Sequence, residues 1–136
     1  MNSGGYMNKD KVALIVEDST TVRFQVRALL DQIGVSLREA GGELGLFNLI
    51  EVYGRIPDLI IMDLTLKNED GFELIKKLRA HPSYSGIPII VLTEHADTEH
   101  VLEARALGVE DYIRKPINKE IFLAKLSDLL GLSQDQ

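Results

Sequence analysis

The sequence predicts an α/β fold in which five strands alternate with five helices. Three runs, residues 12–16, 59–64 and 87–93, are almost continuously apolar, which is typical of strands buried on both faces of a parallel sheet. Two further runs, residues 35–39 and 110–114, mix polar with apolar residues and therefore suit the edges of that sheet. Segments of helical periodicity separate the runs, so the chain predicts a (βα)₅ arrangement without internal repeats.

The sequence signals for the first helix are stronger than those for the second. Ser19 and Thr20 are both good N-caps for the first helix, and Gly34 is a suitable residue to end it. The second helix is expected to end near Gly54, but Gly45 close to its start lowers its helix propensity. We therefore expect the second helix to be the weaker of the two.

The last three helices have clearer starts. Asp70 is expected to cap the third helix, with Glu73 three residues later in a pattern that resembles a capping box. Asp97 precedes the fourth helix, and the fifth is expected from Asn118 to Gly131. Three apolar strands flanked by two mixed ones favour the order 2-1-3-4-5, the three-layer sandwich of flavodoxin-like folds.

Composition limits the classes of function. The 136 residues suggest one domain, with 45% hydrophobic and 26% charged residues. The net charge of −6 argues against direct nucleic-acid binding, which depends on basic contacts to phosphates. Cysteine is absent, and neither a membrane span nor a signal peptide is apparent, so we expect a cytoplasmic protein.

The chain divides into three expected segments. Residues 1–10 are small and polar and are expected to be a disordered leader or tag. Residues 11–130 contain all the expected strands and helices and form the domain. Residues 131–136 are expected to be a tail or the stub of a linker.

Polar residues follow four of the expected strands. Glu17 and Asp18 follow the first strand, Asp63 the third, Thr93 ends the fourth, and Lys115 follows the fifth. In an open parallel sheet the carboxyl ends of the strands share one edge, where ligands bind. We therefore expect three carboxylates, a hydroxyl and an ammonium group to lie close together.

Most of these residues would also have an ordinary structural explanation if each were taken alone. Asp18 would serve as a helix cap, Thr93 is favoured in strands, and Lys115 alone would be a surface lysine. Asp63 is harder to explain in this way, because it follows an apolar run and no nearby cap accounts for it. The combination, rather than any single residue, favours a functional site.

Clustered acids predict a cation. Two like charges about 4 Å apart repel by roughly 4 kcal/mol at an effective dielectric constant near 20. Lys115 supplies only one positive charge against three negative ones, so a hard divalent ion such as Mg²⁺ or Mn²⁺ is expected. The three histidines, His81, His95 and His100, do not form a zinc pattern and are expected to be solvated.

The sequence resembles a response-regulator receiver domain of two-component phosphorelay signalling, over about residues 11–130. The resemblance is specific because five separated elements agree in order and in strand context. They are the acidic pair Glu17-Asp18, Asp63 after an apolar strand, "DGFEL" at 70–74, Thr93 within "VLTEHAD", and Tyr112 with Lys115-Pro116.

The resemblance implies a role for each site residue. Asp63 would be the phosphoacceptor, receiving a phosphoryl group from a sensor histidine kinase or a phosphotransfer protein. Asp18 and Asp63 would bind Mg²⁺ directly, Glu17 through water, and Thr65 through its backbone carbonyl. Lys115 would pair with the carboxylate before the reaction and with a phosphoryl oxygen after it. Such a protein is a signalling phosphoacceptor that assists its own phosphorylation and slow autodephosphorylation, rather than an enzyme.

The resemblance also implies a switch. Thr93 would move toward the phosphoryl group and Tyr112 would rotate into the space released, which changes the surface of helix 4, strand 5 and helix 5. Family members bind partners or form homodimers through this surface. The residue before Pro116 commonly has a cis peptide bond in receivers.

Three residues depart from the family pattern. Many receivers have proline at the position of Lys67 and a methionine-like residue at that of Glu69, so we expect a more polar and mobile loop here. The residue after the switch threonine is usually small, whereas this chain has Glu94. We expect Glu94 to repel anionic small phosphodonors.

Two alternatives belong to other classes. A pseudo-receiver would be an interaction module that takes no phosphate, and binding of beryllofluoride would argue against it. A haloacid-dehalogenase-like phosphatase also uses an aspartate after an apolar strand, but requires a second acid where this chain has Thr65. A stable phosphoprotein, rather than turnover of a substrate, would distinguish the receiver from the enzyme.

Overall fold

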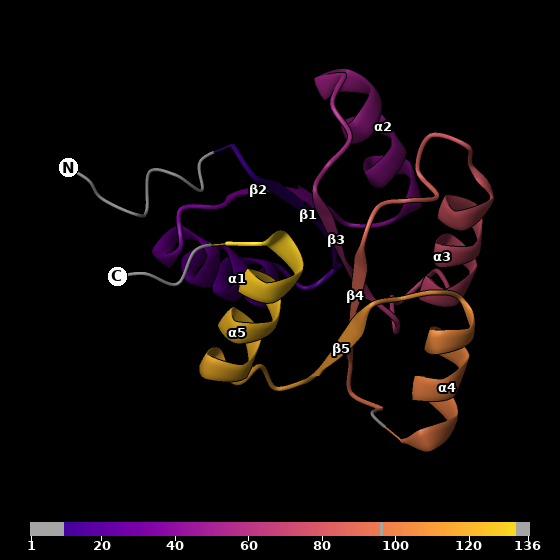
Figure 1. Cartoon of the computed structure of the whole chain (residues 1–136). Helices are drawn as coiled ribbons and strands as arrows, with labels where there is room; N and C mark the ends of the chain where they lie inside the picture. Colours follow the sequence, from indigo (N-terminus) through magenta and orange to yellow (C-terminus); the bar gives the residue numbers. More distant parts are fainter. Residues whose placement is uncertain (1–9, 96, 133–136) are drawn as a thin grey trace.

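The computed structural model, which describes residues 10–95 and 97–132, has a parallel five-stranded sheet between two layers of helices (Figure 1). The strand order β2-β1-β3-β4-β5 confirms the predicted order. Most of the expected leader and tail, residues 1–9 and 133–136, lies outside the described residues. The strands are β1 Val12–Val16, β2 Ser36–Ala40, β3 Leu59–Asp63, β4 Ile89–Thr93 and β5 Asp111–Arg114. The helices are α1 Thr20–Gln32, α2 Glu43–Tyr53, α3 Gly71–Ala80, α4 Thr98–Ala106 and α5 Lys119–Leu130.

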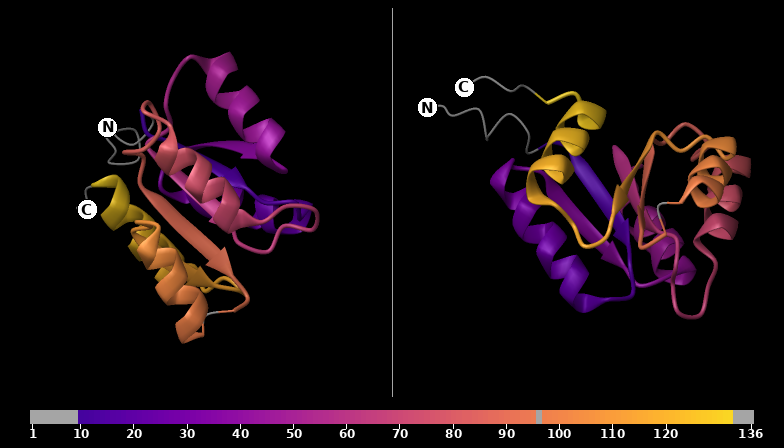
Figure 2. Two further views of the ribbon diagram at one scale, coloured as in Figure 1. Left: turned by 90° about the vertical axis from the view of Figure 1, so that its right-hand side faces the viewer. Right: turned by 90° about the horizontal axis from the view of Figure 1, so that it is seen from below.

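The two faces of the sheet carry separate hydrophobic cores. Helices α1 and α5 cover one face, and α2, α3 and α4 cover the other (Figures 1 and 2). Alternate residues of the central strands enter opposite cores, so that Ile61 packs toward α1 and α5 while Met62 packs toward α2 and α3. All five residues of β3 and of β4 are buried, which explains their continuous apolar sequence.

Four helices start at residues that the sequence predicted as caps. Ser19, Asp70, Asp97 and Asn118 each accept a hydrogen bond from a backbone N–H in the first turn of their helix. Among the described residues, Glu73 pairs with Lys76 at 3.0 Å and makes no capping-box hydrogen bond to the Asp70 N–H. None of the helices in the described ranges is long and apolar enough to cross a membrane.

Two central strands are shorter than predicted. β3 ends at Asp63, because the carbonyl of Leu64 turns away to accept from Gly71 N–H at 3.4 Å. β4 starts at Ile89 rather than at residue 87, since Pro88 has no N–H to donate and Ile87 bonds back to the turn at Tyr84. Both changes shift only the ends of the strands.

The strand register aligns the residues expected at the site. Val16 pairs with Met62, Asp63 with Leu92, and Thr93 with Arg114. The residues that follow these positions therefore leave the sheet at the same edge, as expected for parallel strands.

Candidate functional site

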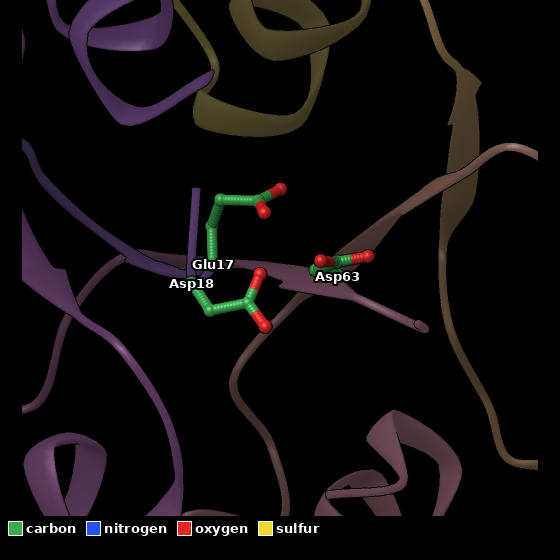
Figure 3. Close-up of side chains that lie close together, drawn as sticks. All are labelled: Glu17, Asp18 and Asp63. Carbon is green, nitrogen blue, oxygen red and sulfur yellow. The ribbon is translucent and has the colours of Figure 1, made fainter. Parts of the chain in front are cut away.

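Three carboxylates meet at the carboxyl edge of the sheet (Figure 3). Each of Glu17, Asp18 and Asp63 offers an oxygen, and these oxygens all lie within 4.8 Å of one another. Glu17 and Asp63 are only 1% exposed, whereas Asp18 lies nearer the surface. The close approach that was predicted from the strand ends is therefore present.

Lys115 provides the cation of this cluster. Its Nζ lies 2.9 Å from Glu17 Oε1 and 3.4 Å from Asp63 Oδ1. Its backbone N–H donates to Thr93 O at 2.8 Å, which fixes the start of the β5–α5 loop against the neighbouring strand, and the Lys115–Pro116 peptide bond is cis. Burial works against the charged form of Lys115, but the two carboxylates outweigh it and raise its pKa.

Glu17 is buried and has a contact at each of its carboxylate oxygens. Its Oε2 accepts from Ser19 N–H at 3.1 Å. Its Oε1 is buried and ion-paired with Lys115, but this contact does not have the geometry of a hydrogen bond. No described residue donates a hydrogen bond to Oε1. Burial raises the pKa of the Glu17 carboxyl, Asp63 raises it further, and Lys115 opposes both.

The cluster has the composition of a site for a hard divalent cation. Three carboxylates face one ammonium group, and the buried Oε1 of Glu17 accepts no hydrogen bond from any described residue. Carboxylate oxygens are the ligands that Mg²⁺ and Mn²⁺ prefer, and the described residues place no histidine among them. The donor set thus fits the ion that the sequence predicted.

Local backbone contacts orient Asp63. Its Oδ1 accepts from Thr65 N–H at 3.0 Å and from Thr65 Oγ1 at 3.2 Å. Gly71 lets α3 begin directly against the strand end, since a Cβ at this position would lie 2.7 Å from Leu64 Cα and closer still to the Asp63 carbonyl oxygen. This gives a physical reason for the glycine in "DGFEL": only the absence of a side chain permits the approach.

The two expected switch residues lie in different surroundings. Thr93 is 1% exposed at the end of β4, and its hydroxyl oxygen accepts from His95 N–H at 2.8 Å. Tyr112 is half-buried on the edge strand, with Lys125 Nζ 4.7 Å from the centre of its ring. Tyr112 therefore stands apart from the carboxylates, while Thr93 lies on the strand beside Asp63.

Sequence reasoning missed Arg23. Its Nη1 donates to the backbone carbonyl of Glu17 at 2.5 Å, and its Nε donates to Glu39 at 3.1 Å. Arg27, one turn later in α1, also binds Glu39. The signal would have been two arginines four residues apart on a helix that packs on a strand carrying an acid.

The departures from the family pattern lie around the site. Glu94 is exposed and lines a surface hollow together with Lys115 and Pro116. Lys67 and Glu69 are also exposed, as a polar loop predicts. The Lys67 N–H nevertheless donates to Asp18 Oδ2 at 2.7 Å, a backbone contact for which the side chain gives no signal.

Comparisons with a family model and with known proteins indicate the same family. The family model described as the response regulator receiver domain matches residues 13–127. A chemotaxis protein CheY homolog from Campylobacter jejuni is 32% identical over 119 residues, which cover 87% of this chain and 91% of that protein.

Two further similarities extend this result. The sensor histidine kinase CheAY from Helicobacter pylori is 26% identical over 93% of this chain, which spans only 16% of that protein's length. The solved structure of the chemotaxis protein CheY4 from Vibrio cholerae has a TM-score of 0.80 and 28% identity, and covers 88% of this chain and 98% of its own. Similar domains thus occur both alone and within longer proteins.

Proposed function

Because the chain belongs to the response regulator receiver domain family, we propose that Asp63 accepts a phosphoryl group from a sensor histidine kinase or a phosphotransfer protein. Receiver domains are signalling phosphoacceptors that bind Mg²⁺ at an acidic pocket. The observation that carries the proposal for this chain is the buried Asp63 carboxylate, which lies between two further acids and the ammonium group of Lys115.

The reaction is a phosphoryl transfer to a carboxylate oxygen. An oxygen of Asp63 forms a bond to phosphorus while the P–N bond of a donor phosphohistidine breaks. The bonding electron pair leaves with the imidazole nitrogen, which takes up a proton. In the described part of the chain, both Thr65 donors and Lys115 engage Oδ1 of Asp63, so we assign the phosphoryl group to Oδ2.

The surrounding residues have separate roles in this proposal. Asp18 and Asp63 would hold Mg²⁺ directly, Glu17 through water, and Thr65 through its carbonyl oxygen. When bound, the ion would neutralise charge on the phosphoryl oxygens. Lys115 is the remaining cation, and its ion pair with Asp63 becomes available to a phosphoryl oxygen once the carboxylate has reacted.

The readout of phosphorylation would begin at Thr93. A phosphoryl group adds about −1.5 to −2 charges at neutral pH and strong acceptor oxygens. The Thr93 hydroxyl, which accepts from His95 N–H, still has its own proton to donate to such an oxygen. Its movement would draw Tyr112 inward and change the surface of α4, β5 and α5, where a homodimer or an output partner would bind.

Chemical labelling tests the proposal. The protein is incubated with a small acyl phosphate and Mg²⁺, and the product is analysed for a hydroxylamine-sensitive acyl phosphate by intact mass. We expect one label on wild-type protein and none on Asp63→Asn. Equal labelling of Asp63→Asn would contradict the assignment. Absence of both labelling and Mg²⁺-dependent beryllofluoride binding would favour a pseudo-receiver, and multiple turnover of phosphodonor without a stable label would favour a phosphatase.

A further inference from the structure

The loop between β3 and α3, residues 64–70, is tied at two points to other parts of the chain. Near its middle, Lys67 N–H donates to Asp18 Oδ2 at 2.7 Å. Near its end, Glu69 Oε1 accepts from Glu43 N–H, the first residue of α2, at 2.7 Å. One loop therefore touches both the acidic cluster and the start of a helix that is remote from it in sequence.

Helix α2 lacks a side-chain cap of its own. Its N-cap residue is Gly42, which has no side chain to accept from the first turn. The carboxylate of Glu69, 26 residues further along the chain, takes this position instead. Such a group satisfies an otherwise free N–H and is favoured by the positive end of the helix dipole.

The space for Glu69 depends on Gly42. A Cβ at position 42 would lie 2.8 Å from Glu69 Oε1, so any side chain there would push the carboxylate away. The side chain of Glu43 is held separately by Lys77 of α3 at 2.7 Å. Glu69 and Gly42 thus form a contact that is specific to this loop and this helix.

The other part of the loop orients two of the three acids. Thr65 binds Oδ1 of Asp63 through its N–H and its hydroxyl, and Lys67 N–H binds Asp18. Lys67 lies two residues before Glu69, so the contact of Glu69 with α2 restrains the part of the loop that donates to Asp18. Groups that orient metal ligands from behind commonly change metal affinity by about tenfold or more when removed.

We infer that Glu69 is a positioning residue for the acidic site: by capping α2 it holds the β3–α3 loop so that Asp18 and Asp63 face a divalent cation. The inference rests on the metal site of the proposed function. It also gives a role to a residue that departs from the family pattern, and it implies that metal binding is sensed at the start of α2.

Metal titrations with four variants test the inference. Affinity for Mn²⁺ is measured by electron paramagnetic resonance on wild-type protein, Glu69→Ala, Glu69→Gln and Gly42→Ala, with Glu51→Ala as a control that removes an exposed glutamate elsewhere on α2. We expect about threefold to tenfold weaker binding for Glu69→Ala and Gly42→Ala. Glu69→Gln keeps an acceptor oxygen and should retain most of the affinity, and Glu51→Ala should bind normally.

A second measurement separates positioning from loss of charge and from loss of stability. In wild-type protein, Mg²⁺ titration should shift the amide signals of Lys67 and Glu43 in NMR spectra, and the shift at Glu43 should disappear in Glu69→Ala. Gly42→Ala is informative because the backbone of Gly42 is extended, which alanine also adopts, and because no charge changes.

The outcomes are distinguishable. If wild-type protein binds no divalent ion, the proposed function fails and this inference fails with it. If wild-type protein binds normally while Glu69→Ala and Gly42→Ala bind equally well at a temperature where both are folded, the inference alone is overturned. Equal weakening by Glu69→Ala and Glu69→Gln, with normal binding by Gly42→Ala, would assign the effect to charge and would also overturn the inference.

Discussion

The acidic residues at the two edges of the sheet differ in how they are paired with basic residues. At the amino edge, Asp58 accepts from Val12 N–H at 2.8 Å and from Arg55 at 3.0 Å. Also at that edge, Glu110 accepts from Ile89 N–H at 2.7 Å and lies 3.4 Å from Arg79. Each acid completes the hydrogen bonding of the first residue of a strand and has an arginine of its own.

The carboxyl edge has no such balance. Glu17, Asp18 and Asp63 converge, and Lys115 pairs with two of them. Arg23 lies nearby but donates to the backbone of Glu17 and pairs with Glu39, so it does not neutralise the cluster. At the amino edge each of these two acids has one arginine, whereas the carboxyl edge holds three carboxylates for one ammonium group, an imbalance expected of a site that binds an ion or a phosphoryl group.

The largest expected effect follows from removing a ligand at the carboxyl edge. Asp18→Ala should lower Mg²⁺-dependent labelling of Asp63 by about 100-fold or more, because the ion loses a direct ligand. Chelation of the metal should do the same to wild-type protein. Labelling with a small acyl phosphate measures both effects, and circular dichroism should show an unchanged fold. Labelling of Asp18→Ala at the wild-type rate would contradict the site.

Replacing Lys115, the cationic side chain of the site, should lower the stability of the fold. Lys115→Met should lower the free energy of unfolding by about 3 kcal/mol in metal-free buffer, since it leaves buried carboxylates without a partner. Added Mg²⁺ should recover part of this loss. Urea unfolding with and without Mg²⁺ measures the difference, with Lys76→Met as the control because Lys76 pairs with Glu73 on the surface. Equal stability of the two variants would argue against charge imbalance at the site.

A substitution at the amino edge should lower stability without changing the labelling of Asp63. Asp58→Ala should cost about 1–2 kcal/mol of stability, since Val12 N–H and Arg55 lose their acceptor. Labelling of Asp63 should stay at the wild-type rate, because the substitution lies at the opposite edge of the sheet. A parallel loss of labelling in conditions where the variant is fully folded would break the distinction between the two edges.

Access to the carboxyl edge should depend on Glu94. Glu94 lines the hollow beside Lys115, so Glu94→Ala should raise the rate of labelling by a small anionic phosphodonor roughly twofold to tenfold. Glu94→Gln separates charge from size and should give most of the increase. An unchanged rate for both variants would contradict the repulsion that we expect from the sequence.

The smallest effect concerns an exposed pair near the same edge. Asp97 accepts from His100 Nδ1 at 2.9 Å and raises the pKa of His100 above 6.5, although slight burial opposes the shift and Glu99 and Glu103 favour it. A raised pKa stabilises the fold below pH 6.5 and loses that contribution as the pH rises through the folded value. NMR titration of the imidazole should give a value above 6.5 that falls in Asp97→Asn.

Local sequence patterns determined most of the fold. Continuous apolar runs mark β3 and β4, and side-chain caps mark the starts of α1, α3, α4 and α5, because these signals lie within a few residues of the structure they specify. Topology then follows from which strands are apolar on both faces. The same rule places Glu17, Asp63 and Lys115 at one edge before any coordinates are known.

Only the tertiary structure decided which hydrogen-bond partners orient these residues. The Lys67 contact to Asp18 joins residues 49 apart and uses a backbone N–H, so it has no sequence signal. Glu69 caps a helix that precedes it in the chain, and Arg23 binds the carbonyl of Glu17 across the α1–sheet interface. Such contacts depend on loop geometry and on the packing of distant elements, whereas periodicity and capping depend on neighbours in sequence. The sequence by itself therefore determined which groups meet at the edge of the sheet, and the packing decided which oxygen faces which donor.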